Sequence, residues 1–411
     1  MQQTKPFVIP KPLVVQAYKR VKANKGSPGV DGQTLYGFDQ DLKDNCYKLW
    51  NRLSSGSYHP PEVKRVEINK PCGGIRPLGI PTVSDRMAQM VVKLLIEPEL
   101  ERHFHPDSYG YRPNKSAHQA LKKTAERCRQ HAWVLDMDIK GFFDNIDHAL
   151  LMKAVDKHIE ESWIKLYIQR WLTAPVQHPD GQIEERTKGT PQGGVISPLL
   201  ANLYLHYVFD QWMKTHYPDI PFERYADDIV CHCNNEYMGD KLKAELQARF
   251  SECRLTLHPD KTKLVYCKNR WRKGNYPVIC FDFLGYTFGP KIMKINQGKR
   301  ALYFVATISQ KAAKHIRDQI RGWPWRVWLH RELDEIREHC QNRLRGWLDY
   351  YGLFGAHYIR NILFYFDTRM RIWAKQKYKL FGTVMQAANY VNELRKTTSG
   401  LFVHWQRDAI G

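Results

Sequence analysis

Long apolar segments are absent from this 411-residue sequence. No run approaches the roughly 20 residues that a membrane-spanning helix needs, and residues 1–12 lack the apolar core of a secretory signal peptide. The nine cysteines show no paired framework, which argues against a disulfide-stapled secreted protein. We therefore expect a cytoplasmic protein with reduced thiols and no membrane partner.

Acidic residues are scarce relative to basic ones. The chain has 63 lysines and arginines against 42 aspartates and glutamates, which gives a formal net charge of +21. An excess of this size calls for a polyanionic partner, and the aromatic residues, 12% of the sequence, supply flat surfaces on which bases can stack. The composition therefore indicates nucleic-acid binding. The alternative is an ordinary basic globular protein.

Internal repeats are also absent, and the length suggests more than one domain. Residues 1–60 have mostly helical patterning, residues 61–306 mix strand-like and helical segments, and residues 307–411 are patterned as helices. Ser197 and Pro198 are predicted to cap and open a helix. Strands and helices mixed around one sheet indicate an α+β fold, and we predict three domains with these boundaries.

Asp227 and Asp228 lie between two short apolar segments, residues 222–225 and 229–233, that are patterned as the strands of a hairpin. Adjacent carboxylates in such a turn repel one another and are costly unless a positive charge compensates them. A bound divalent metal ion would do so. The alternative is a solvated turn, because aspartate is common in turns.

A further candidate carboxylate ends another predicted strand, residues 133–139. Alternation along this strand puts Asp136 and Asp138 on one face, with Asp138 nearer the strand end, where ligands gather. Nucleotidyl transfer uses two divalent ions with oxygen ligands. We therefore assign Asp138 to metal binding with the acidic pair of the hairpin, and expect two magnesium ions, which manganese can replace. Asp136 is interpreted as supporting, and Asp144 and Asp147 as helix-capping residues.

Cys231, His232 and Cys233 raise the alternative of a zinc site. Structural zinc needs four ligands at suitable spacing, and no second pair of such ligands lies nearby in the sequence. The three residues also fall within a predicted strand, so we expect no zinc here.

Four motifs in one order give the sequence a family resemblance. Residues 225–228, YADD, resemble the YxDD motif of reverse transcriptases, and Asp138 followed by Phe142-Phe143 resembles their first carboxylate motif. Residues 189–198, GTPQGGVISP, resemble the QGxxxSP motif, and residues 70–76, KPCGGIR, resemble the hairpin that grips the triphosphate. Each motif alone is weak, but the four together imply a right-hand polymerase with fingers, a palm built on an antiparallel sheet with packed helices, and a helical thumb.

The more specific resemblance is to bacterial group II intron-encoded proteins, which combine a reverse transcriptase with a maturase that assists splicing. Residues 25–32 resemble their N-terminal extension, residues 108–113 the next motif, residues 283–286 the primer grip, and residues 345–351 the maturase thumb. Many relatives carry an HNH endonuclease with paired cysteines. This sequence has no CxxC pair, so we expect no such domain.

The resemblance implies a role for each matching residue. Phe143 would exclude ribonucleotides by contact with the sugar, and Lys261 is a candidate proton donor to pyrophosphate. The metal ligands would be Asp138, Asp227, Asp228 and the backbone carbonyl of Ile139. Nucleotide binding would fall to Lys70, Arg76, Phe143 and Gln192. Nucleic-acid binding would fall to Arg112, Gly193, Gly194, Leu284, Gly285, Arg343 and Arg345.

Three of these roles have a simpler alternative. Lys70 and Arg76 could belong to a solvated basic hairpin, Phe143 could be an ordinary core residue, and Gly193-Gly194 could form a plain turn before the next helix.

Three functions are compatible with these residues. The first is an intron-encoded reverse transcriptase and maturase that binds group II intron RNA, assists splicing and copies the intron into DNA during retrohoming. It would use an RNA template, a DNA primer or target DNA, and dNTPs, and would associate with the nucleoid when acting on DNA. The second is a group II-like reverse transcriptase adapted to host DNA repair or phage defence. The third, an RNA-binding splicing factor with a decayed polymerase site, is disfavoured by the intact carboxylates.

Overall fold

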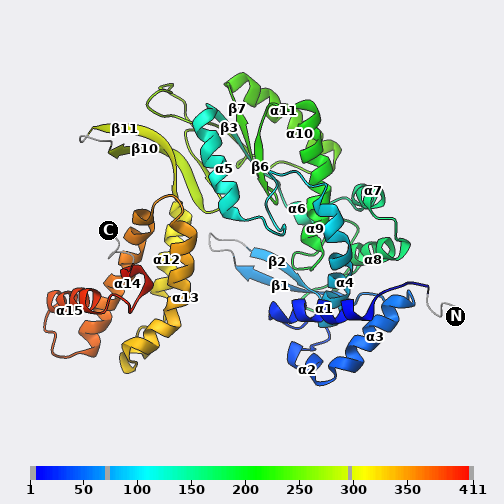
Figure 1. Ribbon diagram of the computed structural model, residues 1–411, viewed down its shortest axis with the longest axis horizontal. Coiled ribbons are helices and arrows are strands. Elements are labelled where there is room, and N and C mark those ends of the chain that lie inside the picture. The colour runs from blue at the N-terminus through cyan, green and yellow to red at the C-terminus, as the bar shows by residue number, and fades with distance from the viewer. Residues whose placement is uncertain (1–5, 70–74, 295–298, 407–411) are drawn as a thin grey trace. The chain divides into compact units, whose positions relative to one another are not determined.

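The computed structural model describes residues 6–69, 75–294 and 299–406. The chain separates into two compact units, Met1–Val265 and Tyr266–Gly411 (Figure 1). The predicted α+β class is confirmed, because strands and helices are combined in one fold. The boundary between the units lies at residue 265 and not at residue 306, and the three-domain division stays a prediction. Within the described ranges, no helix is both long and apolar enough to cross a bilayer.

The first unit contains two sheets. The smaller strands β4 (Val176–Gln177) and β5 (Ile183–Glu184) extend an antiparallel hairpin of β1 (Val63–Asn69) and β2 (Ile75–Ile80), in the order β2-β1-β4-β5. This confirms the predicted hairpin, whose turn at residues 70–74 lies outside the described residues. The helices before and around this sheet are α1 (Lys11–Ala23), α2 (Leu35–Gln40), α3 (Leu42–Ser54), α4 (Val83–Glu101), α6 (Phe142–Asn145), α7 (His148–His158) and α8 (Ser162–Thr173).

The second sheet carries the acidic residues and has the order β6-β7-β3-β8. Both β3 and β6 pair with β7 in antiparallel fashion, as predicted. Helix α5 lies on one face of this sheet (Figure 1), and α9, α10 and α11 lie on the other. The strands are β3 (Trp133–Asp138), β6 (Phe222–Tyr225), β7 (Asp228–Cys233) and β8 (Lys263–Tyr266), and the helices are α5 (Ala117–Gln130), α9 (Ser197–Leu205), α10 (Gln211–His216) and α11 (Glu236–Glu252).

Strand β6 buries a charged side chain on each of its faces. On one face the Arg224 guanidinium donates to both carboxylate oxygens of Asp210, at 2.8 and 2.7 Å, and to Asn202 Oδ1 at 2.9 Å. Arg224 and Asp210 have no solvent-exposed side-chain surface. Bidentate pairing satisfies both charges and fixes their geometry, so β6 is held to the helix behind it.

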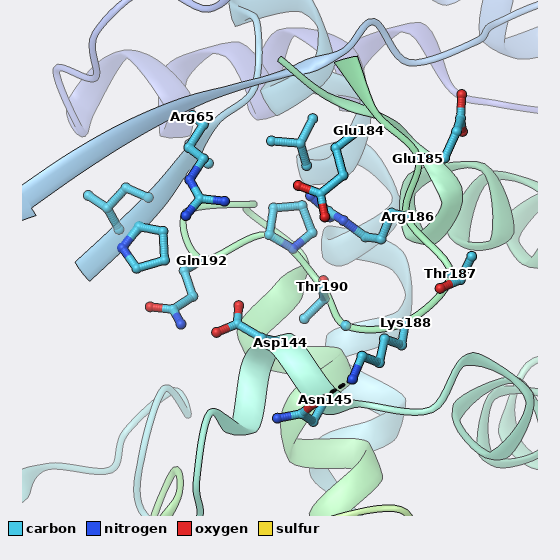
Figure 2. Close-up of a pocket in the computed structure, with 16 residues that line it drawn as sticks. Arg65, Asp144, Asn145, Glu184, Glu185, Arg186, Thr187, Lys188, Thr190 and Gln192 are labelled. Atoms are coloured by element: carbon cyan, nitrogen blue, oxygen red, sulfur yellow. Dashed lines mark hydrogen bonds between the residues drawn. The ribbon is translucent and has the colours of Figure 1, made fainter. Parts of the chain in front are cut away.

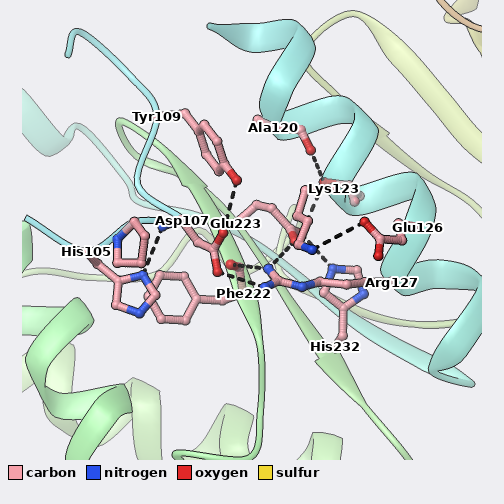
Figure 3. A network of polar contacts seen from close by, with 12 residues as sticks. His105, Asp107, Tyr109, Ala120, Lys123, Glu126, Arg127, Phe222, Glu223 and His232 are labelled. Carbon is pink, nitrogen blue, oxygen red and sulfur yellow. Dashed lines mark hydrogen bonds and ion pairs between the residues drawn. The ribbon is translucent and has the colours of Figure 1, made fainter. Parts of the chain in front are cut away.

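On the other face of β6, Glu223 is the centre of a second network (Figure 3). Its carboxylate accepts from Arg127 and Thr124 of α5, and lies 2.6 Å from His232 Nε2 on β7. Arg127 also donates to Asp107 at 2.7 Å. The network ties β6 to α5, to β7 and to the loop before α5.

Helix α9 begins at Ser197, but Ser197 is not its N-cap. Ile196 occupies that position, and the Ser197 hydroxyl lies 2.8 Å from the Thr190 hydroxyl. The predicted cap is therefore wrong, because the buried serine binds the preceding loop instead of a free backbone N–H of the helix. The helix continues through a π-helical turn, His206–Asp210, into α10.

The second unit joins a three-stranded sheet, in the order β11-β10-β9, to a helical region, as predicted for the C-terminal part of the chain. The helices pack around a core rich in tryptophan, including Trp323, Trp325, Trp328 and Trp373. The elements are β9 (Phe281–Phe283), β10 (Tyr286–Lys294), β11 (Arg300–Ile308), α12 (Gln310–Arg321), a 3₁₀ turn (Val327–His330), α13 (Leu333–Tyr351), α14 (Ala356–Lys377), α15 (Val384–Thr397) and α16 (Val403–Gln406).

The buried pair behind β6 gives a stability prediction. Burial raises the pKa of Asp210, but the charge and hydrogen bonds of Arg224, helped by His206, outweigh it and lower that pKa to about 2. This contribution to folding is complete above the ordinary pKa of 3.8 and is lost as the pH falls toward 2. At neutral pH, Asp210→Asn should lower the free energy of unfolding by ~3–5 kcal/mol, because it leaves a buried guanidinium without its counter-charge. Urea denaturation followed by circular dichroism measures this loss.

Two controls sharpen that experiment. Asp219→Asn alters an exposed aspartate and should leave the unfolding transition unchanged. Replacing both partners together, Asp210→Leu with Arg224→Met, should cost less than Asp210→Asn alone, since no unpaired charge stays buried. If Asp210→Asn unfolds like Asp219→Asn, the pair does not hold β6 in place.

Candidate active site

The tip of the β6–β7 hairpin is a two-residue turn with an unusual backbone. Tyr225 and Asp228 face each other as the last paired residues, which leaves Ala226 and Asp227 in the turn. Ala226 has φ 57°, a left-handed conformation that costs a non-glycine residue about 1 kcal/mol. The loop that contains Gly110 packs directly against this turn. Only glycine fits there, because a Cβ on Gly110 would be 2.4 Å from the Ala226 nitrogen. The turn is thus held in one conformation by the loop beside it.

Strand β3 brings the third carboxylate to the same place. Asp138 ends β3 and is the register partner of Asp228 across the antiparallel pair. Its backbone carbonyl accepts from His258 N–H at 2.7 Å, and its side-chain carboxylate pairs with Lys261. Asp138, Asp227 and Asp228 therefore come together, as the sequence predicted, at the end of β3 and the tip of the β6–β7 hairpin.

The three carboxylates lose hydration at this position and repel one another. Loss of hydration and the charge of Asp138 raise the pKa of Asp227, opposed by Arg76 and Lys261. Loss of hydration and the charges of Asp227 and Asp138 raise the pKa of Asp228 to about 7, although its side chain keeps access to solvent. Lys261 offsets only part of this repulsion, so the cluster favours a further cation.

The described residues do not form a closed metal cage. No group of three His, Cys, Asp or Glu side chains within them is arranged as a ready-made ligand set. Magnesium, however, is commonly held by one or two carboxylates together with substrate phosphates and water. Paired acids at an open strand edge fit that mode of binding. Asp138 and Asp227 would be direct ligands, with Asp228 beside them, and the Ile139 carbonyl as a ligand stays a prediction.

Arg76 reaches from the β1–β2 hairpin to the loop that precedes α9. Its Nε donates to Gln192 Oε1 at 3.0 Å, and its positive charge is among those that act on Asp227. An exposed guanidinium in this position can bind a triphosphate through its planar fork. Lys70, the other predicted triphosphate ligand, lies outside the described residues.

Gly193 lets two backbones approach closely. It has φ 125°, and a Cβ there would lie 2.4 Å from the carbonyl oxygen of Gly79 in β2. The adjacent Gln192 carbonyl accepts from Gly79 N–H at 2.8 Å. At Gly194 a Cβ would meet the Ser197 hydroxyl at 2.4 Å. In this structure both glycines make room for protein atoms; their contact with a base pair stays a prediction.

Phe142 and Phe143 open the short helix α6 directly after the break that follows β3. Both are mostly buried, at 2% and 8% exposure, and their ring centroids are 5.3 Å apart. The Phe143 carbonyl accepts from Thr190 N–H at 2.7 Å, which joins α6 to the Gln192 loop. Phe143 retains the larger exposed fraction, and its role at the sugar stays a prediction.

A cavity of about 380 Å³ lies between β1, β2 and residues 184–192 (Figure 2). The side chains of Arg65, Arg186 and Asp144 point toward it. Burial raises the pKa of Asp144, whereas Arg186, Arg65, a hydrogen bond from Gln192, and Lys188 oppose the rise. Arg65 Nε and Arg186 Nη1 are buried without a hydrogen-bond partner in the described structure, so the cavity suits a ligand rich in acceptor atoms.

Sequence reasoning gave Asp144 only a capping role and overlooked Arg65 and Arg186. The available signal was the cluster of charged residues at positions 184–188, EERTK, directly before the GTPQGGVISP motif. Asp147, by contrast, caps α7 as predicted, because its side chain accepts from Leu150 N–H at 2.9 Å.

Arg112 is engaged within the protein. Its side chain is only 5% exposed, and its guanidinium donates to Glu101 and to the backbone carbonyls of His105 and Ser108. Arg112 therefore braces the loop before α5, and its contact with nucleic acid stays a prediction.

Four further predicted nucleic-acid residues, Leu284, Gly285, Arg343 and Arg345, lie in the second unit. Leu284 and Gly285, at φ 49° and 81°, form the two-residue turn between β9 and β10, whose Leu284 carbonyl accepts from Tyr350 Oη at 2.8 Å. Arg343 and Arg345 are exposed on α13. Their contacts with nucleic acid stay predictions.

The cysteine–histidine triplet forms the C-terminal half of β7. Alternation directs His232 to the face of Glu223, to which it is paired, while Cys231 and Cys233 are buried on the opposite face. The three side chains therefore diverge and are not arranged to bind one ion.

Comparison with known proteins agrees with this geometry. Residues 68–288 match the family of reverse transcriptases, RNA-dependent DNA polymerases, and this stretch contains all three clustered carboxylates. Residues 313–397 match the maturase-specific domain of group II introns. The chain therefore belongs to the group II intron reverse transcriptase/maturase family, as its motifs predicted.

Individual relatives differ in how much of their length is shared. Protein YkfC of Escherichia coli is 30% identical over 367 residues, which cover 78% of this chain and 90% of YkfC. The group II intron-encoded protein LtrA of Lactococcus lactis is 37% identical over 193 residues, 46% of this chain but only 32% of LtrA. Telomerase from Candida albicans, solved with a fragment of telomeric RNA, superposes over 91% of this chain and 68% of that one, with a TM-score of 0.46 and 12% identity.

The contact between Gly193 and Gly79 generates a prediction. Gly193→Ala should push the Gln192 loop away from β2, displace Arg76 from Gln192 and raise the KM for dNTPs. Overpacking of this kind should also lower the free energy of unfolding by ~1–3 kcal/mol. Steady-state primer extension and urea denaturation measure the two effects.

Gly181→Ala is the matched control. Gly181 also has positive φ, 88°, but a Cβ there meets nothing within 4 Å. It should reproduce the backbone strain without the clash and leave the KM unchanged. Equal KM values for both variants would contradict the proposed coupling between β2 and the Gln192 loop.

Proposed function

We propose that this member of the reverse transcriptase family copies RNA into DNA by two-metal nucleotidyl transfer at Asp138, Asp227 and Asp228. The observation that carries the proposal is the register pairing of Asp138 with Asp228, beside Asp227 in a strained turn. Two divalent ions, magnesium in the first instance, would assist deprotonation of the primer hydroxyl and neutralise charge on the leaving pyrophosphate.

The protein's own residues would position the substrate. Asp138 and Asp227 provide carboxylate oxygens on rigid strands, Arg76 binds the triphosphate, and Gln192 orients the incoming nucleotide. Gln192 is already fixed by its contact with Arg76 and by the Gly79 hydrogen bond to its carbonyl. Fixed donors of this kind lower the barrier because they need no reorganisation during reaction.

For the macromolecular partner we propose group II intron RNA, with splicing assistance and retrohoming as the biological role. The maturase-specific match over residues 313–397 and the exposed arginines of α13 support this choice. A splicing assay with the RNA that flanks the reading frame tests it. If the protein extends primers but promotes no splicing of that RNA, a role in host DNA repair or phage defence takes its place.

Asp227→Asn should abolish DNA synthesis and leave RNA binding intact. The substitution removes a charged metal ligand while the shape of the turn is kept. Primer extension on an RNA template with magnesium measures the first effect, and filter binding measures the second. Asp260→Asn, at a side chain 90% exposed near the same site, is the matched control and should retain activity. Near-normal extension by folded Asp227→Asn would refute the metal assignment.

Phe143→Ala should raise incorporation of ribonucleotides relative to deoxyribonucleotides by about ten-fold or more, because an aromatic ring beside the sugar leaves no room for a 2′-hydroxyl. Single-nucleotide insertion kinetics with dNTP and rNTP measure the ratio. Phe142→Ala is the internal control: it should destabilise the protein by ~3–5 kcal/mol without changing sugar choice. An unchanged ratio for Phe143→Ala, or a change confined to Phe142→Ala, would show that Phe143 is not the gate.

A further inference from the structure

Residues 267–280 form a segment that the proposed polymerase site does not use. It connects β8 to β9 and carries Lys268, Arg270, Arg272 and Lys273 but no acidic residue. Asp282, the next acidic residue along the chain, lies 3.9 Å from Lys311. The segment is therefore locally and strongly basic.

A buried asparagine gives this segment a fixed shape. Asn269 is 7% exposed, and its Oδ1 accepts from the backbone N–H groups of Trp271 and Arg272, at 2.9 and 3.0 Å. The Arg270 N–H donates to the Leu302 carbonyl of β11 at 2.9 Å. The turn is thus anchored to the β10–β11 ribbon, and it presents Trp271 at a defined position.

Trp271 has a surface exposure that no other tryptophan of the chain shares. All twelve tryptophans are described; eleven are buried or partly buried, whereas Trp271 is 68% exposed. Exposing such a ring forfeits the stabilisation that its burial would supply, and it leaves a ring face available for stacking on a planar ligand.

Arg270 lies close to two aromatic rings. Its guanidinium carbon is 3.9 Å from the Trp271 ring centroid and 5.3 Å from that of Tyr303 on β11. Tyr303 is the register partner of Lys291, so a lysine lies beside the stack on the same face of the ribbon. Alternating planar groups with flanking ammonium groups form the kind of surface that stacks bases and neutralises phosphates.

We propose that Trp271, Arg270 and Tyr303 form a stacking site for unpaired bases of single-stranded RNA, with Lys273 and Lys291 near the phosphates. Stacking on a ring face is tolerant of base identity, so the site would hold the strand without reading its sequence. The choice of RNA over DNA rests on the proposed function, in which the template is RNA. A basic surface without acidic residues also disfavours a protein partner of ordinary composition.

The test measures binding of the full-length chain to a labelled, unstructured RNA of about ten nucleotides, a typical site size. Trp271→Ala should weaken binding by about 5-fold or more, and Trp271→Phe should restore most of the loss. The slope of log Kd against log salt should stay unchanged, because no phosphate contact is removed. Arg270→Lys, which keeps the charge but loses the plane, should also weaken binding.

Controls separate stacking from charge and from general damage. Tyr237→Ala removes another exposed aromatic ring, 76% exposed on α11, and should have no effect. A strand of abasic ribose-phosphate should bind wild type and Trp271→Ala equally. An unchanged RNA affinity for Trp271→Ala, or an equal loss on the abasic strand, would overturn the proposal. A loss confined to DNA of the same sequence would assign the site to DNA and overturn the choice of RNA.

This experiment is independent of catalysis. Binding is measured without metal ions or dNTPs, and it can be repeated in the Asp227→Asn background. Failure of the wild-type protein to extend primers would therefore refute the proposed polymerase function and leave the binding result standing. Loss of RNA binding in Trp271→Ala, with Asp227→Asn binding normally, would support the stacking site on its own.

Discussion

Three carboxylates that repel one another must be held together before any metal arrives, and the architecture of the first unit meets that constraint. The acids lie at the end of β3 and at the tip of the β6–β7 hairpin, where loss of hydration, together with their mutual charge, raises the pKa of Asp228 to about 7. Only a rigid framework keeps such groups adjacent. That framework is β6, whose Glu223 and Arg224 are each buried in an ionic network on opposite faces. Breaking either network leaves a buried charge without a partner, so the strand resists movement.

Close backbone contacts transmit this rigidity to the residues that would meet the nucleotide. Gly110 lets the loop before α5 press on the Ala226 turn, and Gly193 lets the Gln192 loop cross β2 at Gly79. Any side chain at these glycines would separate the elements. The acidic turn and the β1–β2 hairpin are thus each held by backbone contacts, which are shorter and stiffer than contacts between flexible side chains.

The residue pattern of short segments was sufficient to predict the strands and the hairpin that carry the acidic residues. Alternation located β3, and two apolar segments around an acidic pair located the β6–β7 hairpin with Asp227 and Asp228. The same pattern could not predict the contacts of a side chain whose partner lies in another segment of the chain. Arg112 looked like a free cation but is paired with Glu101, and Ser197 looked like a cap but binds Thr190. The pairing of Arg224 with Asp210 crosses between two elements and leaves no periodic trace, so the support of the site could not be predicted.

The π-helical turn His206–Asp210 shows why that support needs an irregular helix. Each residue of an α-helix advances the side-chain direction by about 100°, so the one extra residue of a π turn rotates everything beyond it by that amount. Asp210 is the last residue of this turn, and Asn202, which contacts the same guanidinium, lies in the regular helix before it. Eight residues apart, the two would diverge by about 80° on a regular helix. The π turn changes the angle between the Asn202 and Asp210 side chains. Both side chains contact Arg224 across this interruption of the regular helix.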